Sequence, residues 1–215
     1  MQRVVTPELL DSLPADDPAA MRSRQDLRRI NFLMGNFRWL ARALEEAGLV
    51  PGSAVVEVGS GDGRFAGALA NLGYSVTSID LAPRPRDIPE SVHWIQGDLF
   101  EKLPQLQGDA LIANLFWHHF EANQLTTLAP TIQQFPLVLA NEPLRAHFPQ
   151  ALGAVLVPFI NKITRHDLFV SIRAGFRPGE LTNHWQLEDG SWEIQESTGL
   201  LGAYRLKARR RPPQS

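Results

Sequence analysis

The central part of the chain alternates between short apolar runs and longer amphipathic stretches. Apolar and β-branched residues bounded by turn residues predict strands at 53–58, 74–79, 92–96, 109–115 and 136–140. Helix-like periodicity separates them at 64–72 and 121–134, and Pro130 should shorten or kink the second helix. Strands that alternate with helices are typical of a mostly parallel sheet with helices on both faces.

The N-terminal part of the chain follows a different pattern. Residues 1–17 are polar and contain two prolines, so we expect a loosely ordered arm. Apolar positions then recur at spacings of three and four up to Ala47, which predicts helices. Gly35 is expected to divide them, and Gly48 suits the C-terminal cap of the second helix.

The C-terminal third of the chain does not continue the alternation. Residues 142–177 are expected to form a long, largely helical apolar insertion, and 192–196 and 203–207 to form two closing strands. We therefore expect an N-terminal arm with cap helices at 1–50. A main domain at 51–215 would follow, with a helical cap insertion at about 142–177.

Composition narrows the classes of protein that fit. The chain has 215 residues, 44% of them hydrophobic, which suffices for a substantial core. It has no cysteine, which excludes disulfides, thiolate metal sites and a cysteine nucleophile. A net charge of −2 argues against a dedicated nucleic-acid binder, and the basic cluster at 207–211 is interpreted as a solvated tail. With no secretory signal and no long apolar run, we expect a cytoplasmic protein without a membrane partner.

The run at 55–65 is the most informative motif in the chain. Apolar residues of a buried strand lead to Glu57, which is followed by Gly59, Gly61 and Gly63 and then by a helix-compatible stretch. A tight glycine turn between a strand and a helix lets a ligand approach bare backbone. The third glycine comes one residue early for a dinucleotide fingerprint, and a carboxylate at Glu57 would repel a pyrophosphate.

Acidic residues end the first three predicted strands. Glu57, Asp80 and Asp98 fall at the ends of strands one, two and three. Acids are depleted from strands, and ligands of open α/β sheets bind beyond the carboxyl ends of the strands. Any one of the three is explained equally well as a helix cap or a surface residue, but the three together indicate a binding site.

The E-x-G-x-G-x-G pattern resembles motif I of class I S-adenosylmethionine-dependent methyltransferases. The resemblance implies an α/β fold with a Rossmann-like, seven-stranded, mostly parallel sheet, a C-terminal antiparallel hairpin and, in this chain, a helical cap. It also implies S-adenosyl-L-methionine as the cofactor. A generic glycine turn in an unrelated α/β domain and nicotinamide binding are the alternatives.

The resemblance also implies a role for each cofactor-binding residue. Asp80 would accept the two ribose hydroxyls, and Leu81 would pack against the adenine. Asp98 would accept the adenine amino group while the Leu99 amide donates to the ring, and Glu57 would lie near the methionine end. The expected cofactor-binding residues are Glu57, Gly59, Ser60, Gly61, Asp80, Leu81, Asp98, Leu99 and Asn114.

The histidines after the fourth strand are the candidates for catalysis. Residues 114–120 form the junction that, in the family, borders both the methionine half of the cofactor and the substrate. His118 or His119 is expected to act as a general base, because a histidine pKa near neutrality suits that task. The alternative is that His118 caps or packs the next helix. Adjacent histidines lack metal-ligand spacing, so no metal site is expected.

A second resemblance covers most of the chain. Its order of short motifs is similar to that of the bacterial methyltransferases associated with type III polyketide synthases. The matching segments are 7–11, 27–31, 139–145, 163–167 and 171–176. The chain departs from that pattern at Glu57, where many members carry aspartate, and in its compressed ending after Phe176.

The expected function is therefore methyl transfer to a small-molecule acceptor, an oxygen of a phenolic or polyketide-like compound. Two alternatives remain, a methyltransferase that acts on RNA or protein and a non-catalytic protein that binds S-adenosylmethionine. A nucleic-acid partner is not expected, and the sequence leaves the oligomeric state open.

Overall fold

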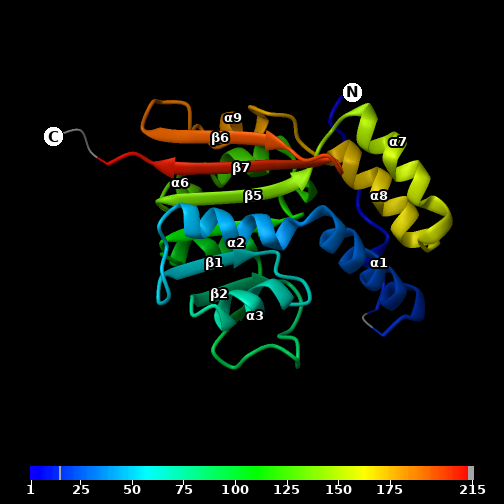
Figure 1. Ribbon diagram of the computed structural model, residues 1–215, viewed down its shortest axis with the longest axis horizontal. Coiled ribbons are helices and arrows are strands. Elements are labelled where there is room, and N and C mark those ends of the chain that lie inside the picture. The colour runs from blue at the N-terminus through cyan, green and yellow to red at the C-terminus, as the bar shows by residue number, and fades with distance from the viewer. Residues whose placement is uncertain (15, 213–215) are drawn as a thin grey trace.

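The computed structural model describes residues 1–14 and 16–212, and its central feature is a seven-stranded sheet (Figure 1). The strands are β1 (Ala54–Val58), β2 (Ser75–Asp80), β3 (His93–Gln96), β4 (Ala110–Asn114), β5 (Leu137–Pro143), β6 (Trp192–Thr198) and β7 (Ala203–Arg210). Their order is β3-β2-β1-β4-β5-β7-β6. The first five strands are parallel, and β7 runs antiparallel to both β5 and β6. The predicted mostly parallel sheet with a closing antiparallel hairpin is confirmed.

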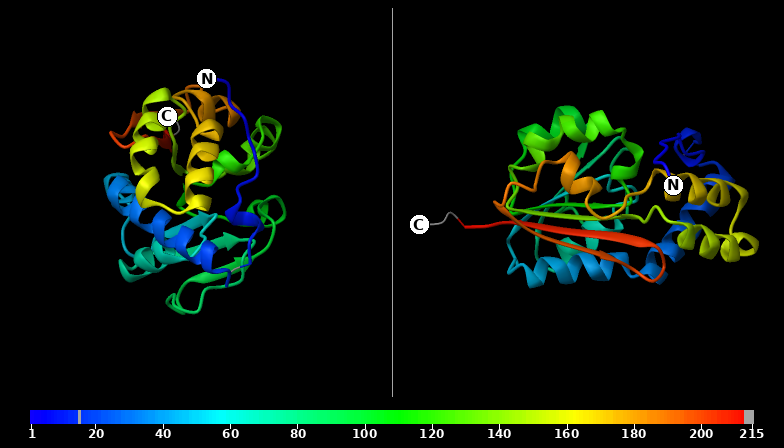
Figure 2. Two further views of the ribbon diagram at one scale, coloured as in Figure 1. Left: turned by 90° about the vertical axis from the view of Figure 1, so that its right-hand side faces the viewer. Right: turned by 90° about the horizontal axis from the view of Figure 1, so that it is seen from above.

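Helices cover both faces of this sheet (Figure 2). They are α1 (Pro18–Met34), α2 (Asn36–Glu46), α3 (Arg64–Asn71), α4 (Leu99–Lys102), α5 (Ala122–Thr127), α6 (Ala129–Ile132), α7 (His147–Leu156), α8 (Lys162–Ala174) and α9 (Glu180–His184). Short 3-10 turns add η1 (Leu10–Ser12), η2 (Leu103–Gln105), η3 (Trp117–His119) and η4 (Val157–Phe159). The helix expected at 121–134 is shortened, as Pro130 suggested: α5 ends at Thr127, and α6 begins at Ala129, one residue before the proline.

The two faces of the sheet have separate apolar cores because neighbouring strand residues point to opposite sides. Val55 packs with residues of α2 and α3, including Leu44 and Leu69. Val56 packs on the other face with α5 and α6, including Leu125. The near-continuous apolar sequence of the central strands follows from this burial on both faces.

Three helices form a cap beyond the carboxyl ends of the parallel strands, and they are α1, α7 and α8 (Figure 1). Polar contacts join two of them. On α1, Asp26 accepts the backbone amide of Asn161 at 2.9 Å and the hydroxyl of Thr164 at 3.1 Å. Gly35, at φ +65°, separates α1 from α2 as expected. In this way the chain leaves the cap and returns to the sheet.

The N-terminal arm is ordered against the cap, so the expectation of a loosely ordered arm is wrong for residues 1–14. Arg3 donates to the carbonyls of Ala174 and Phe120, each at 2.7 Å. The carboxylate of Asp167 accepts both backbone amides of residues 9–10, at 2.8 and 3.0 Å. Long-range contacts of this kind leave no local sequence pattern. Residue 15 of the expected arm and 213–215 of the expected main domain lie outside the described residues.

The C-terminal strands are longer than the apolar pattern indicates. β5 continues through Pro143, so residues 142–143 belong to the sheet and not to the insertion. β7 reaches Arg210, so the basic cluster from Lys207 onward is mostly strand and is not a solvated tail. Lys207 lies 3.7 Å from the carboxylate of Glu46 on α2.

Candidate active site

The glycine turn follows β1 directly and precedes α3. Gly59, Gly61 and Gly63 all have positive φ, at +66°, +54° and +68°. A Cβ on Gly59 would lie 2.1 Å from Cδ2 of Phe116, so that ring packs on the turn itself. At Gly61 a Cβ would meet nothing within 4 Å. The turn is therefore held by packing at its start and leaves bare backbone accessible in its middle.

Asp80, at the end of β2, lies next to the glycine turn because β1 and β2 are parallel neighbours. Its carboxylate accepts the backbone amide of Gly61 at 2.7 Å and that of Ala82 at 2.8 Å. The next residue, Leu81, is 75% exposed. The structure thus brings a fixed carboxylate, an apolar side chain and the glycine turn together.

Asp98 performs a structural task at the end of β3. It is the N-cap of α4, and its Oδ1 accepts the backbone amide of Phe100 at 2.7 Å. The side chain of Leu99 is buried in the core. Asp98 therefore serves as a helix cap, and its expected role toward the adenine stays a prediction. The cap uses one carboxylate oxygen, which leaves acceptor capacity on the other.

Glu57 is a buried carboxyl group at 3% exposure. Burial raises its pKa to about 8, against hydrogen bonds that favour the charged form. The hydroxyl of Ser78 donates to Oε2 of Glu57 at 3.4 Å. Ser60 is also buried, and its hydroxyl donates to the Glu57 carbonyl at 3.4 Å. Glu57 therefore carries a proton in much of the neutral pH range.

A line of amide side chains connects the sheet to the cap. Nδ2 of Asn114, the last residue of β4, donates to Oδ1 of Asn31 on α1 at 3.1 Å. Oδ1 of Asn114 in turn accepts from Asn141 on β5 at 2.9 Å. Arg28 of α1 lies 3.8 Å from Asp62 of the glycine turn. The first cap helix thus lies over both the glycine turn and the end of β4.

Glu142 is a buried carboxylate of the candidate site that the sequence analysis did not single out. It is fully buried, and its Oε1 accepts the backbone amides of Phe116 at 2.9 Å and Trp117 at 2.8 Å. Its Oε2 lies 2.7 Å from ring Nδ1 of His118. The available signal was the Asn-Glu-Pro sequence after an apolar strand, which we had assigned to the start of the insertion. Glu142 fixes both the backbone of η3 and the ring of His118.

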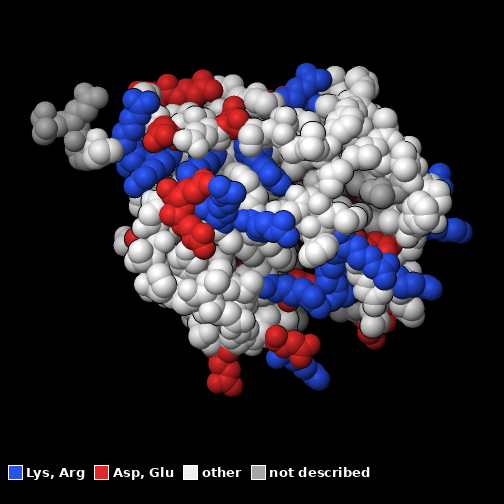
Figure 3. Space-filling model, in the orientation of Figure 1, with Lys and Arg blue, Asp and Glu red and all other residues white. Residues whose placement is uncertain are grey.

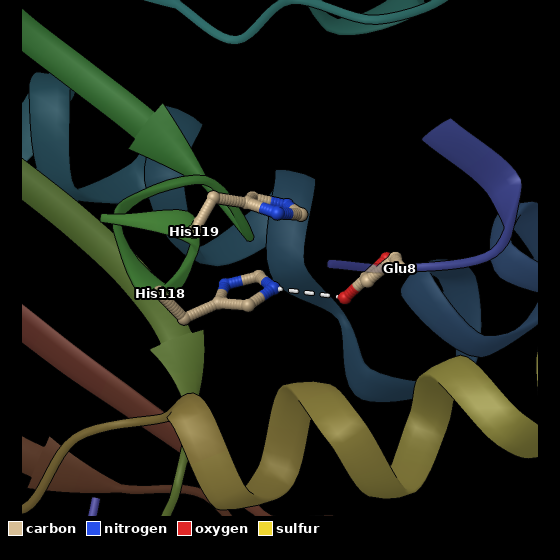
Figure 4. Close-up of side chains that lie close together, drawn as sticks. All are labelled: Glu8, His118 and His119. Carbon is tan, nitrogen blue, oxygen red and sulfur yellow. Dashed lines mark hydrogen bonds and ion pairs between the residues drawn. The ribbon is translucent and has the colours of Figure 1, made fainter. Parts of the chain in front are cut away.

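The two histidines of η3 meet a carboxylate from the N-terminal arm (Figure 4). Nε2 of His118 lies 3.4 Å from Oε1 of Glu8. Nδ1 of His119 lies 3.7 Å from Oδ2 of Asp11. The ring centroids of the histidines are 4.3 Å apart. We call Glu8, His118 and His119 the histidine cluster.

The two imidazoles of the cluster have opposite pKa shifts. Burial alone would lower the pKa of His118, but its hydrogen bonds and charge interactions with Glu142 and Glu8 raise it to about 9. Burial, and then the neighbouring charge of His118, lower the pKa of His119 to about 4. One ring is therefore cationic and the other neutral at neutral pH.

Phe116 lies between the two halves of the candidate site. Its ring packs on Gly59, and its centroid is 5.4 Å from that of Trp117 and 6.5 Å from that of His119. Leu115, just before it, has a φ of +55°, an uncommon conformation for a non-glycine residue that is typical of functional loops. The glycine turn and the histidine cluster are therefore adjacent parts of one site.

Comparisons with known proteins agree with this geometry. Residues 56–131 match the family model described as a methyltransferase domain. None of the curated proteins matches the chain. The structure resembles the plantazolicin methyltransferase BpumL in complex with a pentazolic desmethylPZN analog and SAH. That match has a TM-score of 0.69 and 10% identity, and it covers 91% of this chain and 92% of that chain.

A second similar structure is magnesium protoporphyrin IX methyltransferase (ChlM) from Synechocystis PCC 6803 with bound SAH. Its TM-score is 0.56 at 15% identity, with 83% of each chain covered. The fold is the Rossmann-like methyltransferase fold that the sequence predicts. These matches also support the predicted enzyme class and S-adenosylmethionine as its cofactor. Among the described residues, no helix is both long and apolar enough to cross a membrane.

Proposed function

We propose that this chain is an S-adenosylmethionine-dependent methyltransferase that methylates an oxygen of a small phenolic or polyketide-like compound. The observation that carries the proposal is the contact between Asp80 and Gly61. It joins the acid that ends the second strand to the bare backbone that follows the first. Both are the positions at which the sequence motif places the nucleoside of the cofactor.

The adenosine half of the cofactor fits the residues around Asp80. A carboxylate has about four acceptor positions, and Asp80 uses two of them on backbone amides. We propose that the other two accept the ribose hydroxyls. Leu81 would cover the adenine, and Asp98 and the Leu99 amide would bind its edge.

The methionine half would extend along the glycine turn toward Asn114. The cofactor would lie close to the backbone of Gly59, Ser60 and Gly61. The space beside Gly61 is open, since a Cβ there would meet nothing within 4 Å. Glu57 and Asn114 would lie near its amino and carboxyl groups. Burial keeps the Glu57 carboxyl protonated. A cationic amino group that approaches it would lower its pKa and so favour the ionised form.

S-adenosylmethionine supplies an activated methyl group on a cationic sulfur: the acceptor oxygen forms the new C–O bond while the C–S bond breaks, the sulfur keeps that electron pair, and the acceptor loses its proton. The chain contributes by aligning the acceptor and excluding water, an effect worth about 7–11 kcal/mol in favourable cases. We propose His118 and His119 as the catalytic residues, which would hold the acceptor oxygen while its proton leaves to solvent. Glu142 would act through them as a positioning residue.

The cap favours a small acceptor over a macromolecule. α1 and α8 are joined across the carboxyl ends of the strands, and α1 lies over the glycine turn. Lys and Arg side chains are interspersed with Asp and Glu on the face shown in Figure 3. A nucleic-acid interface normally needs a continuous basic surface. A role on RNA therefore has no support from this face.

Calorimetric titration of S-adenosylhomocysteine into wild type, Asp80→Ala and Asp87→Ala tests the cofactor site. Asp87 is an exposed acid on the loop after β2 and serves as the matched control. We expect Asp80→Ala to weaken binding at least about tenfold, since two hydrogen bonds to a charged group are lost, while Asp87→Ala binds like wild type. Wild type that ignores the ligand would end the proposal.

Methyl transfer from labelled S-adenosylmethionine tests the acceptor. A panel of simple phenols and enolic polyketide-like compounds should give methyl ethers. Label that enters RNA or protein in place of these compounds would contradict the acceptor class while leaving the cofactor site intact.

A further inference from the structure

We propose that Glu8, His118 and His119 bind a divalent transition-metal cation such as Zn²⁺. One carboxylate oxygen and one nitrogen from each ring lie within 4.8 Å of one another (Figure 4). Two imidazoles and one glutamate form a ligand set that catalytic zinc sites use, with a further position open to water or substrate. The sequence did not indicate this site, because the third ligand lies 110 residues before His118.

The separation of the Glu8 and His118 ligand atoms fits a tetrahedral ligand set. Metal–ligand bonds of about 2.0–2.2 Å in a tetrahedron separate the ligand atoms by about 3.3–3.5 Å. Oε1 of Glu8 and Nε2 of His118 lie 3.4 Å apart. The rings of His118 and His119 extend toward the Glu8 carboxylate (Figure 4). The ligand nitrogen of His119 lies within 4.8 Å of the ligand atoms of both Glu8 and His118.

Groups around the cluster hold the ligands in place. Nδ1 of His118 faces Glu142 at 2.7 Å, so Nε2 is the nitrogen left to coordinate. A carboxylate behind a ligating histidine is the usual support of a metal site, because it fixes the ring and raises its basicity. Glu142 is itself fixed by backbone amides of η3.

Contacts with α8 hold Glu8 and the residues after it in place. Asp167 accepts the amides of residues 9–10, and the hydroxyl of Ser171 donates to the Glu8 carboxylate. The carboxylate of Asp11 lies 3.7 Å from His119. It would serve as a further ligand or accept a hydrogen bond from a metal-bound water. The N-terminal arm thus places the carboxylate of Glu8 next to His118 and His119.

The role of the cation rests on the proposed function. A hydroxyl or enol oxygen bound to the cation loses its proton readily, since a bound metal lowers the pKa of an oxygen ligand. The histidine cluster would then hold the acceptor as an oxyanion, and the proton would leave to solvent. This assigns the acceptor to the class of phenols and enols whose oxygen can ligate a metal.

The test uses the full chain, freed of metal with a chelator, and needs neither cofactor nor acceptor. Zn²⁺ binding is measured in competition with a chromophoric chelator, and Co²⁺ provides a visible spectrum that reports nitrogen ligands. We expect one equivalent of each ion. His119→Ala and Glu8→Gln should weaken Zn²⁺ binding at least about tenfold and alter the Co²⁺ bands. His147→Ala, which removes an exposed histidine on α7, is the matched control and should bind like wild type.

Two results would overturn the proposal: wild type that binds neither ion, or undiminished binding in both ligand variants. Circular dichroism establishes whether each variant is folded. If both ligand variants unfold, the Co²⁺ spectrum of the wild type tests the site by itself. Bands of nitrogen-ligated Co²⁺ support the site, and the spectrum of fully aqueous Co²⁺ rejects it. Since S-adenosylhomocysteine binding is measured separately, a failed metal site and a failed methyltransferase assignment remain distinguishable.

Discussion

The carboxylate of Glu142 and the imidazole of His118 form a buried pair, with Oε2 and Nδ1 2.7 Å apart. They come from different parts of the sheet edge, since Glu142 lies near the end of β5 and His118 lies in the turn after β4. The same carboxylate also accepts the amides of Phe116 and Trp117. One side chain therefore sets both the path of the turn and the direction of the ring.

Replacement of Glu142 by glutamine should lower the free energy of unfolding by about 2 kcal/mol. A glutamine offers only one acceptor oxygen, so one of the donors now bonded to Glu142 would face an NH₂ group. Urea denaturation measures the change, and Glu90→Gln, an exposed loop acid, is the control. A Glu142→Gln variant as stable as wild type would show that the Glu142–His118 pair does not fix the turn after β4.

Alanine at Gly59 should be far more damaging than alanine at Gly61. Both positions have positive φ, which costs about 1–2 kcal/mol for alanine. Gly59→Ala adds a clash with Phe116, whose Cδ2 would lie 2.1 Å from the new Cβ, whereas nothing lies near Gly61. We expect a loss of about 3 kcal/mol or more at Gly59 and about 1 kcal/mol at Gly61. Equal losses in thermal or urea unfolding would rule out the packing of Phe116 on the turn.

Glu57 should make stability depend on pH in the opposite sense to an ordinary acid. Burial raises the pKa of Glu57 from its ordinary value of 4.5 to about 8 in the folded protein. The folded state therefore holds the proton more tightly, and stability falls as the pH rises from about 4.5 to about 8. Between about pH 6 and pH 8, wild type should lose about 2 kcal/mol relative to Glu57→Gln, whose side chain does not titrate. Parallel stability curves for the two proteins would contradict the burial of a protonated carboxyl.

Removal of the Asp167 carboxylate should release the N-terminal arm. Asp167→Ala leaves the amides of residues 9–10 without their acceptor, so their hydrogen exchange should accelerate about 10–100-fold. Lys162→Ala, an exposed change on the same helix, should leave their exchange unaltered. Unchanged protection in Asp167→Ala would show that other contacts hold the arm.

The sequence was sufficient to predict the sheet and the residues that gather around the glycine turn. Strand burial on both faces produces apolar runs, and the acids that interrupt them mark the strand ends. Glu57, Gly61 and Asp80 were found because the motif is local or lies at the end of a strongly apolar segment. The placement of Asp80 beside Gly61 then follows from two parallel strands being neighbours.

The surroundings of the histidine cluster were not predictable by the same reasoning. Glutamate and proline are depleted in strands, so the pattern ended β5 before Glu142, although the strand continues through Pro143. A buried carboxylate at this position depends on donors from the preceding crossover, which no local signal reveals. The contact of Glu8 with His118 spans 110 positions and is equally invisible in the chain.

The docked arm also constrains the order in which the molecule assembles during synthesis. Its first residues emerge from the ribosome before any of their partners exist, because Arg3 binds a carbonyl 171 positions later. The arm can dock only after α8 has been synthesised and folded. The arm should therefore dock late in synthesis, after the strands that carry the glycine turn and Asp80.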